Sequence, residues 1–127
     1  MPSFGPSALA ALQQSMRFRM ARESVLAGNI ANSDTPGYRR RDLSFDGVLA
    51  ETTSKMERTH PGHFPKRSGD AAEGRVEMGP RGTRPDENGV DLDHELVEVA
   101  RNAGSFIDQA NVLARMSMLV RTAIGQG

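Results

Sequence analysis

The stretch that decides the fold is LDHELVEVARNAGSFIDQANVLARMSMLVRTAI, residues 92–124. Apolar residues recur in it at alternating steps of four and three, the heptad-like spacing of one face of a long amphipathic helix. We therefore predict a C-terminal helix over residues 90–125, about 50 Å long at 1.5 Å per residue. The face expected to pack against other helices is formed by Leu92, Leu96, Val99, Phe106, Leu113, Val120 and Ile124.

The start of this helix is marked by a turn sequence followed by acidic residues. Asn88-Gly89 precedes it, and either Asp91 or Asp93 can serve as the N-cap, whose carboxylate accepts hydrogen bonds from the first free backbone N–H groups. Acidic side chains in the first turn also suit the positive end of the helix dipole. Gly125 is expected to end the helix.

A second amphipathic helix is predicted near the N-terminus, over residues 8–32, after a flexible tail of residues 1–7. Its apolar side chains are spaced by three or four residues, as on one face of a helix. The packing face expected for this helix is formed by Leu9, Leu12, Met16 and Met20.

The middle of the chain has little apolar material. Residues 33–43 are predicted to form a turn and an extended segment, because Pro36-Gly37 suits the two central positions of a type II turn. A short helix is plausible over residues 44–57, and the polar, Gly- and Pro-rich residues 58–89 are expected to form a flexible loop.

These elements predict an all-α fold in a single domain, residues 1–127, with the two terminal helices as an antiparallel, coiled-coil-like pair around an irregular, flexible middle. A pair of helices has only one seam, which leaves a second apolar stripe on each helix without a partner. The loop could fold back over these stripes, but we favour contacts with neighbouring subunits, because exposed contiguous apolar surface usually marks an interface. The second stripes comprise Phe18 and Val25, and Val97, Ile107 and Met118.

The composition excludes several classes of protein. Lys and Arg number 16, as do Asp and Glu, so the formal net charge of zero gives no general attraction to nucleic acid or to anionic lipid. The absence of Cys excludes disulfides, thiolate metal sites and a cysteine nucleophile. Residues 1–7 have no basic start and no apolar run, so we expect no signal peptide, and no stretch is apolar enough for a membrane span.

Catalytic chemistry finds little support in the sequence. His60 and His63 could offer two imidazoles to a metal, but no third ligand lies nearby, and a metalloenzyme is a remote alternative. No nucleophile elbow, zinc-protease helix motif or phosphate-binding glycine loop occurs. We therefore expect neither an enzyme nor a cofactor.

The most specific local signal is LAGNIANSDTPGY, residues 26–38. It resembles the N-terminal motif of the flagellar basal-body rod, hook and hook-associated family, roughly A-x-N-[LI]-A-N-x-x-T-P-G-Y. Turn chemistry explains Pro36 and Gly37, but it does not explain two spaced Asn residues before them. The matching positions are Asn29, Ile30, Ala31, Asn32, Thr35, Pro36, Gly37 and Tyr38.

Within that family, three features of this chain resemble those of a proximal rod subunit. The chain is too short for additional β domains, residues 59–63 look like the loop motif of such a subunit, and residues 88–124 look like its terminal helix. Asn88-Gly89 replaces the more familiar Gly-Asn at the start of that segment. A sister proximal rod subunit, with a longer terminal helix that contains more Asn and Tyr, is the nearest alternative, and a small helical chaperone or regulatory binding module is another.

The resemblance implies a structural, non-enzymatic subunit of the bacterial flagellum. Such subunits are exported by the flagellar type III apparatus and assemble in the periplasm into the rod of the basal body. The implied partners are further copies of the chain, other rod and basal-body proteins, and components of the membrane ring and export gate, with no nucleic acid among them. The implied role is to link the ring and export gate to the distal axial structure.

Overall fold

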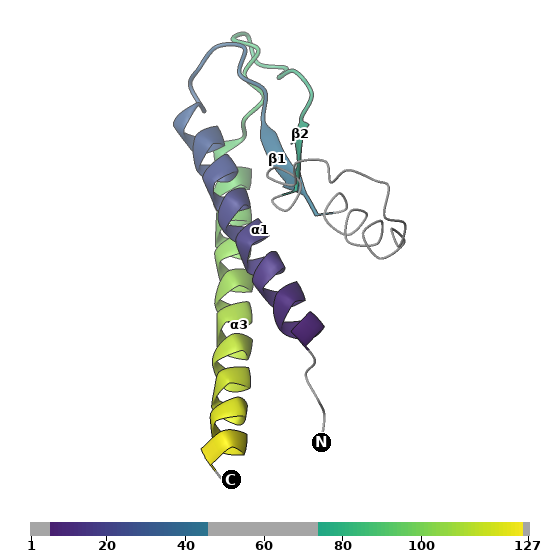
Figure 1. Cartoon of the computed structure of the whole chain (residues 1–127). Helices are drawn as coiled ribbons and strands as arrows, with labels where there is room; N and C mark the ends of the chain where they lie inside the picture. Colours follow the sequence, from purple (N-terminus) through teal and green to yellow (C-terminus); the bar gives the residue numbers. More distant parts are fainter. Residues whose placement is uncertain (1–5, 46–73, 126–127) are drawn as a thin grey trace, which may run out of the picture.

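A computed structural model describes residues 6–45 and 74–125 of the chain. In these residues two long helices lie side by side and run in opposite directions, so that both termini point to the same end of the molecule (Figure 1). Helix α1 spans Pro6–Ala31 and helix α3 spans Leu92–Gly125. The predicted antiparallel pair of terminal helices is therefore confirmed, and the fold is mostly helical.

A small antiparallel sheet lies beside the helices, and the sequence analysis did not predict it. Strand β1, Arg41–Ser44, pairs with strand β2, Arg75–Met78, and Leu43 is opposite Val76. The predicted extended segment thus ends in a strand, and part of the predicted loop 58–89 forms its partner. Except for its first two residues, the predicted short helix over 44–57 lies outside the described residues; of these two, Ser44 ends β1.

The main apolar cluster is small and lies between α1 and β1, and Leu26 and Val90 are buried outside it. Phe18, only 4% exposed, packs with Leu43, and the Phe18 and Phe45 rings meet edge to face with their centroids 5.0 Å apart. Ala21 and Val25 pack against the same cluster. This cluster covers the Phe18 and Val25 stripe with the chain's own middle segment.

Our favoured interpretation of that stripe, contacts with neighbouring subunits, is therefore wrong for Phe18 and Val25. The physical reason is the turn after α1, which sends the chain back along the helix and brings β1 over its apolar face (Figure 1). Gly74 also lets the chain lie close to Phe18 of α1. Its φ is +97°, and a Cβ atom there would lie 2.9 Å from the Phe18 ring.

The residues that connect β2 to α3 also pack closely. A Cβ atom on Gly82 would lie 1.8 Å from the backbone oxygen of Asn88, so only glycine fits at this position. None of the helices in the described part of the chain is apolar enough over a sufficient length to cross a membrane.

Replacing Phe18 with Ala tests the small core. Because the ring is buried, we expect the free energy of unfolding to fall by about 3 kcal/mol, measured by urea unfolding followed by circular dichroism. Met20→Ala is the matched control, since Met20 lies two residues away but is 63% exposed, and it should change the value by less than about 0.5 kcal/mol. Equal effects of the two substitutions would contradict this core.

Candidate functional site

The family-like motif forms a polar joint at the end of α1. Asn29 is completely buried, and its side-chain amide donates hydrogen bonds to the backbone oxygen of Arg41 at 2.6 Å and to Glu95 at 3.1 Å. Its amide oxygen accepts hydrogen bonds from the Arg41 backbone N–H at 3.0 Å and from the Tyr38 hydroxyl at 3.3 Å. One side chain thus joins α1, the start of β1 and α3.

The remaining polar residues of the motif shape the turn that follows α1. The Asn32 side chain donates to the backbone oxygen of Gly28 at 2.8 Å, which satisfies a carbonyl at the helix end, and Thr35 donates to the Asn32 side chain at 3.1 Å. The Tyr38 N–H donates to the Thr35 oxygen at 3.3 Å, and Gly37 has a φ of 71°. These are the features predicted for a type II turn with Pro36-Gly37 at its centre.

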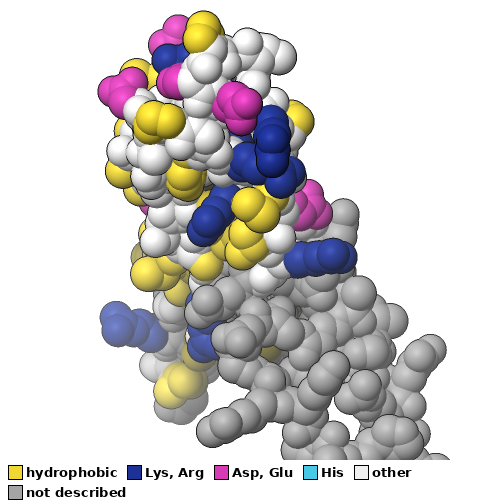
Figure 2. All heavy atoms as spheres, turned by 90° about the horizontal axis from the view of Figure 1, so that it is seen from above, with side chains coloured by type: hydrophobic (Ala, Val, Ile, Leu, Met, Phe, Trp, Pro, Cys, Tyr) yellow, Lys and Arg dark blue, Asp and Glu magenta, His cyan; other side chains and the backbone are white. Residues whose placement is uncertain are grey.

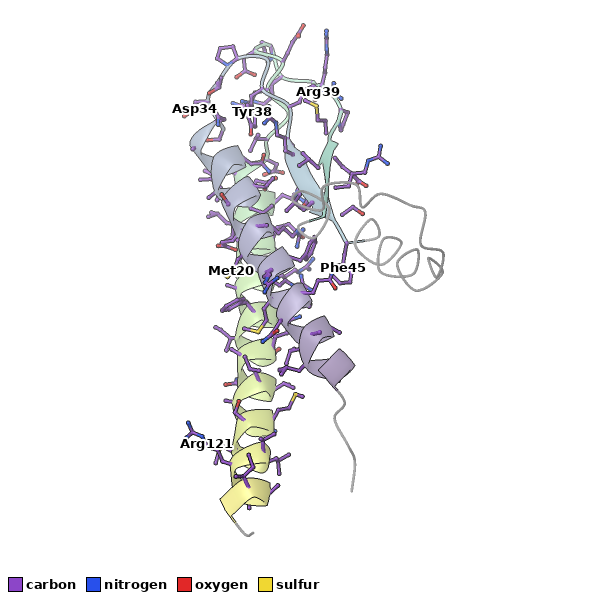
Figure 3. All side chains as sticks on the ribbon, in the orientation of Figure 1. Met20, Asp34, Tyr38, Arg39, Phe45 and Arg121 are labelled. Atoms are coloured by element: carbon purple, nitrogen blue, oxygen red, sulfur yellow. The ribbon has the colours of Figure 1, made fainter. Side chains whose placement is uncertain are left out.

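The segment before α3 is docked onto this turn through Asn88, which is buried. Its side-chain amide donates to the backbone oxygens of Asn32 at 2.9 Å and Thr35 at 2.7 Å, and its oxygen accepts from the Val90 N–H at 2.8 Å. The Gly89 N–H donates to the Tyr38 oxygen at 2.9 Å. Figure 3 shows Asp34 and Tyr38 together at this end of the molecule.

Helix α3 begins directly after this segment, and the two candidate N-caps can now be distinguished. The Asp91 carboxylate accepts hydrogen bonds from the backbone N–H groups of Asp93 at 3.1 Å and His94 at 3.4 Å. Asp91 is therefore the N-cap, and Asp93 lies inside the first turn.

A network of five charged side chains surrounds the joint. Arg22 on α1 holds Asp42 of β1 through two hydrogen bonds, at 2.8 and 3.0 Å, and reaches Glu98 of α3 at 2.8 Å. Arg40 pairs with Asp42 at 3.1 Å and with Glu95, whose side chain is completely buried. Two guanidinium groups thus connect three carboxylates from the strand and α3.

This network shifts the pKa values of Asp42, Glu98 and Arg22. Burial alone would raise the pKa of Asp42, but hydrogen bonds from Arg22, the Leu43 backbone and Arg40 hold it below its ordinary value of 3.8. The hydrogen bond from Arg22 lowers the pKa of Glu98 from 4.5. The hydrogen bond to Asp42 is the main reason that the pKa of Arg22 is raised, so all these groups are charged at neutral pH.

The apolar side chains predicted to form the packing faces lie in two different environments. Leu12, Met16, Val99, Phe106 and Leu113 are half-buried. The others are exposed. Among them is Met20 on α1, which Figure 3 shows on the side of the helix opposite to Phe45, the residue after β1. These exposed residues are Leu9, Met20, Leu92, Leu96, Val120 and Ile124.

The helix interface is centred one residue away from the predicted faces, and polar side chains make specific contacts across it. Asn102 donates to the Arg19 backbone oxygen at 2.8 Å and to Glu23 at 2.9 Å, and Gln109 donates to Ser15 at 2.7 Å. The sequence analysis missed these residues because it followed apolar spacing only. A detectable signal was present, since Asn88, Glu95, Asn102 and Gln109 recur every seven residues. The polar residues that it missed are Arg22, Arg40, Asp42, Asn88, Glu95, Glu98, Asn102 and Gln109.

Large apolar side chains remain exposed along α3. Its C-terminal part continues beyond the region where the helices meet, and Arg121 points away from α1 (Figures 1 and 3). A view from above shows apolar side chains beside a group of basic ones at the joint end (Figure 2). The exposed residues, which we call the apolar surface of α3, are Leu92, Leu96, Val97, Ile107, Val112, Met118, Leu119, Val120 and Ile124.

The described residues contain no group of three or more His, Asp or Glu side chains placed to hold a metal ion. His60 and His63 lie outside these residues. The polar atoms of the joint are engaged with one another in hydrogen bonds and ion pairs, so the joint serves to hold three elements together.

The described residues form two long helices with a polar joint and many exposed apolar side chains, which are features of a helical structural subunit. The comparisons with known proteins agree with this class. The chain is 34% identical to the flagellar basal body rod protein FlgB of Proteus mirabilis over 113 residues, 79% of each chain. It is 36% identical to FlgB of Aquifex aeolicus over 88 residues, 68% of each chain. It is 31% identical to FlgB of Escherichia coli over 107 residues, 76% of this chain and 78% of the relative.

The chain therefore belongs to the family of flagellar basal-body rod proteins FlgB. The predicted family resemblance is confirmed, and these relatives favour FlgB over the sister subunit FlgC, which the sequence analysis left open. No protein-family model matches the chain.

Replacing Asn29 with Ala tests the joint. The variant leaves both Arg41 backbone groups and the buried Glu95 without their amide partner, so we expect the free energy of unfolding to fall by about 2 kcal/mol in urea. Asn111→Ala, at an exposed position on α3, is the control and should change it by less than about 0.5 kcal/mol. A stable Asn29→Ala variant would show that the motif does not hold the elements together.

The lowered pKa values predict a loss of stability in acid. A carboxyl whose pKa is lower in the folded chain than in the unfolded chain stabilises the fold above its ordinary pKa, and this contribution is lost as pH falls through the folded value. We expect the decline to begin below about pH 4.5, with Asp42 and Glu98 contributing.

Asp42→Asn removes one of these carboxylates and should therefore lower stability more at about pH 6 than at about pH 3. Urea unfolding of the parent and the variant at both pH values measures the two differences. Asp108→Asn, at an exposed position on α3, is the control, and its small effect should be the same at both. A pH-independent difference between the parent and Asp42→Asn would refute the assignment.

Proposed function

We propose that the chain is a structural, non-enzymatic subunit of the flagellar basal-body rod. The observation that carries this proposal is membership of the FlgB family together with the apolar surface of α3. A large number of exposed apolar side chains on one element of a monomer favours an interface with another protein. The function is therefore assembly, with α3 as the principal contact element.

The C-terminal third of α3 is the strongest candidate for this contact. Met116 is the last half-buried residue of the helix, and every residue from 117 to 125 is exposed. Four large apolar side chains fall in this stretch, and Met118 is 67% exposed. Their burial by neighbouring chains would add the apolar core that the single chain lacks, since Phe18 and Leu43 are its main buried apolar cluster within the described residues. These four side chains are Met118, Leu119, Val120 and Ile124.

The occupants of this surface are further copies of the chain and other rod proteins. The chain reaches them by the flagellar type III export system, and the assembled rod links the membrane ring and export gate to the distal axial structure in the periplasm. The joint around Asn29 supports this role because it fixes the direction of α3 relative to α1 and the β1–β2 sheet. A subunit in a regular assembly needs such a fixed geometry.

A charge on the apolar surface tests this function. Met118→Asp places a carboxylate where a neighbour would bury an apolar side chain, which is costly, so rod assembly and swimming in soft agar should be lost. The free chain should keep its helix content and melting temperature, because Met118 has little to contact within it. The measurements are motility, recovery in purified basal bodies and circular dichroism.

Asn111→Asp introduces the same charge at an exposed polar position of α3 and serves as the control, with motility retained. Normal motility of the Met118→Asp strain would refute the proposed contact. Loss of folding in the free variant would instead show that Met118 is part of the monomer's own packing.

A further inference from the structure

The face of α3 that packs on α1 carries a polar side chain at every seventh residue. Glu95 and Asn102 are almost completely buried there, and Gln109 is half-buried. We call these three residues the polar column. Positions seven apart lie above one another on a helix that packs in a heptad-like seam, so the column runs along the middle of the interface.

Each member of the polar column has a specific partner outside α3. Glu95 contacts Asn29 and Arg40 at the joint. Asn102, 1% exposed, donates to the Arg19 oxygen at 2.8 Å and to Glu23 at 2.9 Å. Gln109 donates to Ser15 at 2.7 Å. The partners on α1 thus follow the whole length of the interface, from Asn29 back to Ser15.

A second, more apolar seam lies one residue further along α3. Val99, Phe106 and Leu113 lie on α3 between the polar column and a second column of positions, which we call the apolar column. Rotation of α3 about its axis by about 100°, the angle between successive residues, would bring the apolar column to the position that the polar column now holds. The apolar column comprises Leu96, Ala103, Ala110 and Ile124, with Ser117 in the same register, and all of these except Ala110 are exposed.

Hydrophobic burial alone would favour the apolar column, which the structure leaves outside. The polar column also has unmatched hydrogen-bonding capacity, because the side-chain oxygens of Asn102 and Gln109 are buried and accept no hydrogen bond from the described residues. A polar residue in such a seam lowers stability relative to an apolar one, but it permits only the pairing in which it finds its partner.

We infer that Glu95, Asn102 and Gln109 select the face of α3 that packs on α1 and thereby keep the apolar column turned outward. If α3 rotated, the polar column would lose Asn29, Glu23 and Ser15, while Arg22 would lose Glu98. These losses oppose the gain from burying Leu96 and its neighbours. The selection is a property of the single chain, and only its benefit for assembly rests on the proposed function.

Asn102→Ala/Gln109→Ala removes two of the three selecting side chains without making the present face more apolar than the apolar column, and it leaves Glu95 and the ion pairs of the joint in place. Spin labels on Ser24→Cys and Asp108→Cys report the rotation of α3, because both positions are exposed and lie outside both columns. The chain has no other Cys, so the labels are confined to these sites. Labelled chains diluted about tenfold with unlabelled chains restrict the measured electron–electron distances to single molecules.

The parent should show one distance between the labels, and the double variant should show a second one, with helix content retained by circular dichroism. Asn111→Ala/Thr122→Ala is the matched control, because it introduces the same side chains at exposed positions away from both seams, and it should keep the parent's single distance. An unchanged single distance in Asn102→Ala/Gln109→Ala would overturn the inference. So would loss of its helix signal, which would mean that the polar column is required for pairing itself.

If the parent chain failed to assemble into a rod while the spin-label distances behaved as expected, the proposed function would be refuted but the face selection would not. The two conclusions are separable because the distances are measured on the free chain. The reverse result, normal assembly with a single distance in the double variant, would refute the face selection alone.

Discussion

The structure depends on the burial of Asn29 between three elements. Its amide group satisfies both backbone hydrogen-bonding groups of Arg41 and also reaches Glu95, so a single side chain sets the distances among α1, β1 and α3. A buried amide is costly unless its hydrogen bonds are made, which restricts the joint to this arrangement. The ion pairs of Arg22 and Arg40 add charge-assisted bonds between the same elements.

The molecule therefore places a row of polar contacts between its two helices and leaves many large apolar side chains of α3 exposed. In an ordinary small domain the arrangement is the reverse, because burial of apolar side chains supplies most of the stability. Here the apolar cluster around Phe18 covers only one side of α1, and Leu96, Ile107 and Met118 of α3 remain in water. Such a chain is suited to a structure in which neighbours complete the core, as proposed for this member of the FlgB family.

Much of this architecture was predictable from the sequence, including the antiparallel pair of helices, but the faces through which the two helices meet were not. Apolar spacing located both long helices, and the TPGY turn was recognisable from Pro36 and Gly37. The seam was centred one residue away from the predicted one, because apolar periodicity cannot show that Asn102 finds Glu23 across the interface. Strand β2 was missed for a similar reason: its partner β1 is distant in sequence, and all four of its residues are exposed.

Because the C-terminal end of α3 is exposed, its helical order depends on the concentration of the subunit. Residues 117–125 have no buried side chain, so their helical turns are held by local hydrogen bonds, and helical segments shorter than about 12–15 residues are marginal in water. We expect these terminal turns to fray in a dilute chain, whereas neighbours that bind them would stabilise them by mass action. The last part of folding and the first part of polymerisation are then one equilibrium, with a threshold set by the amount of subunit available.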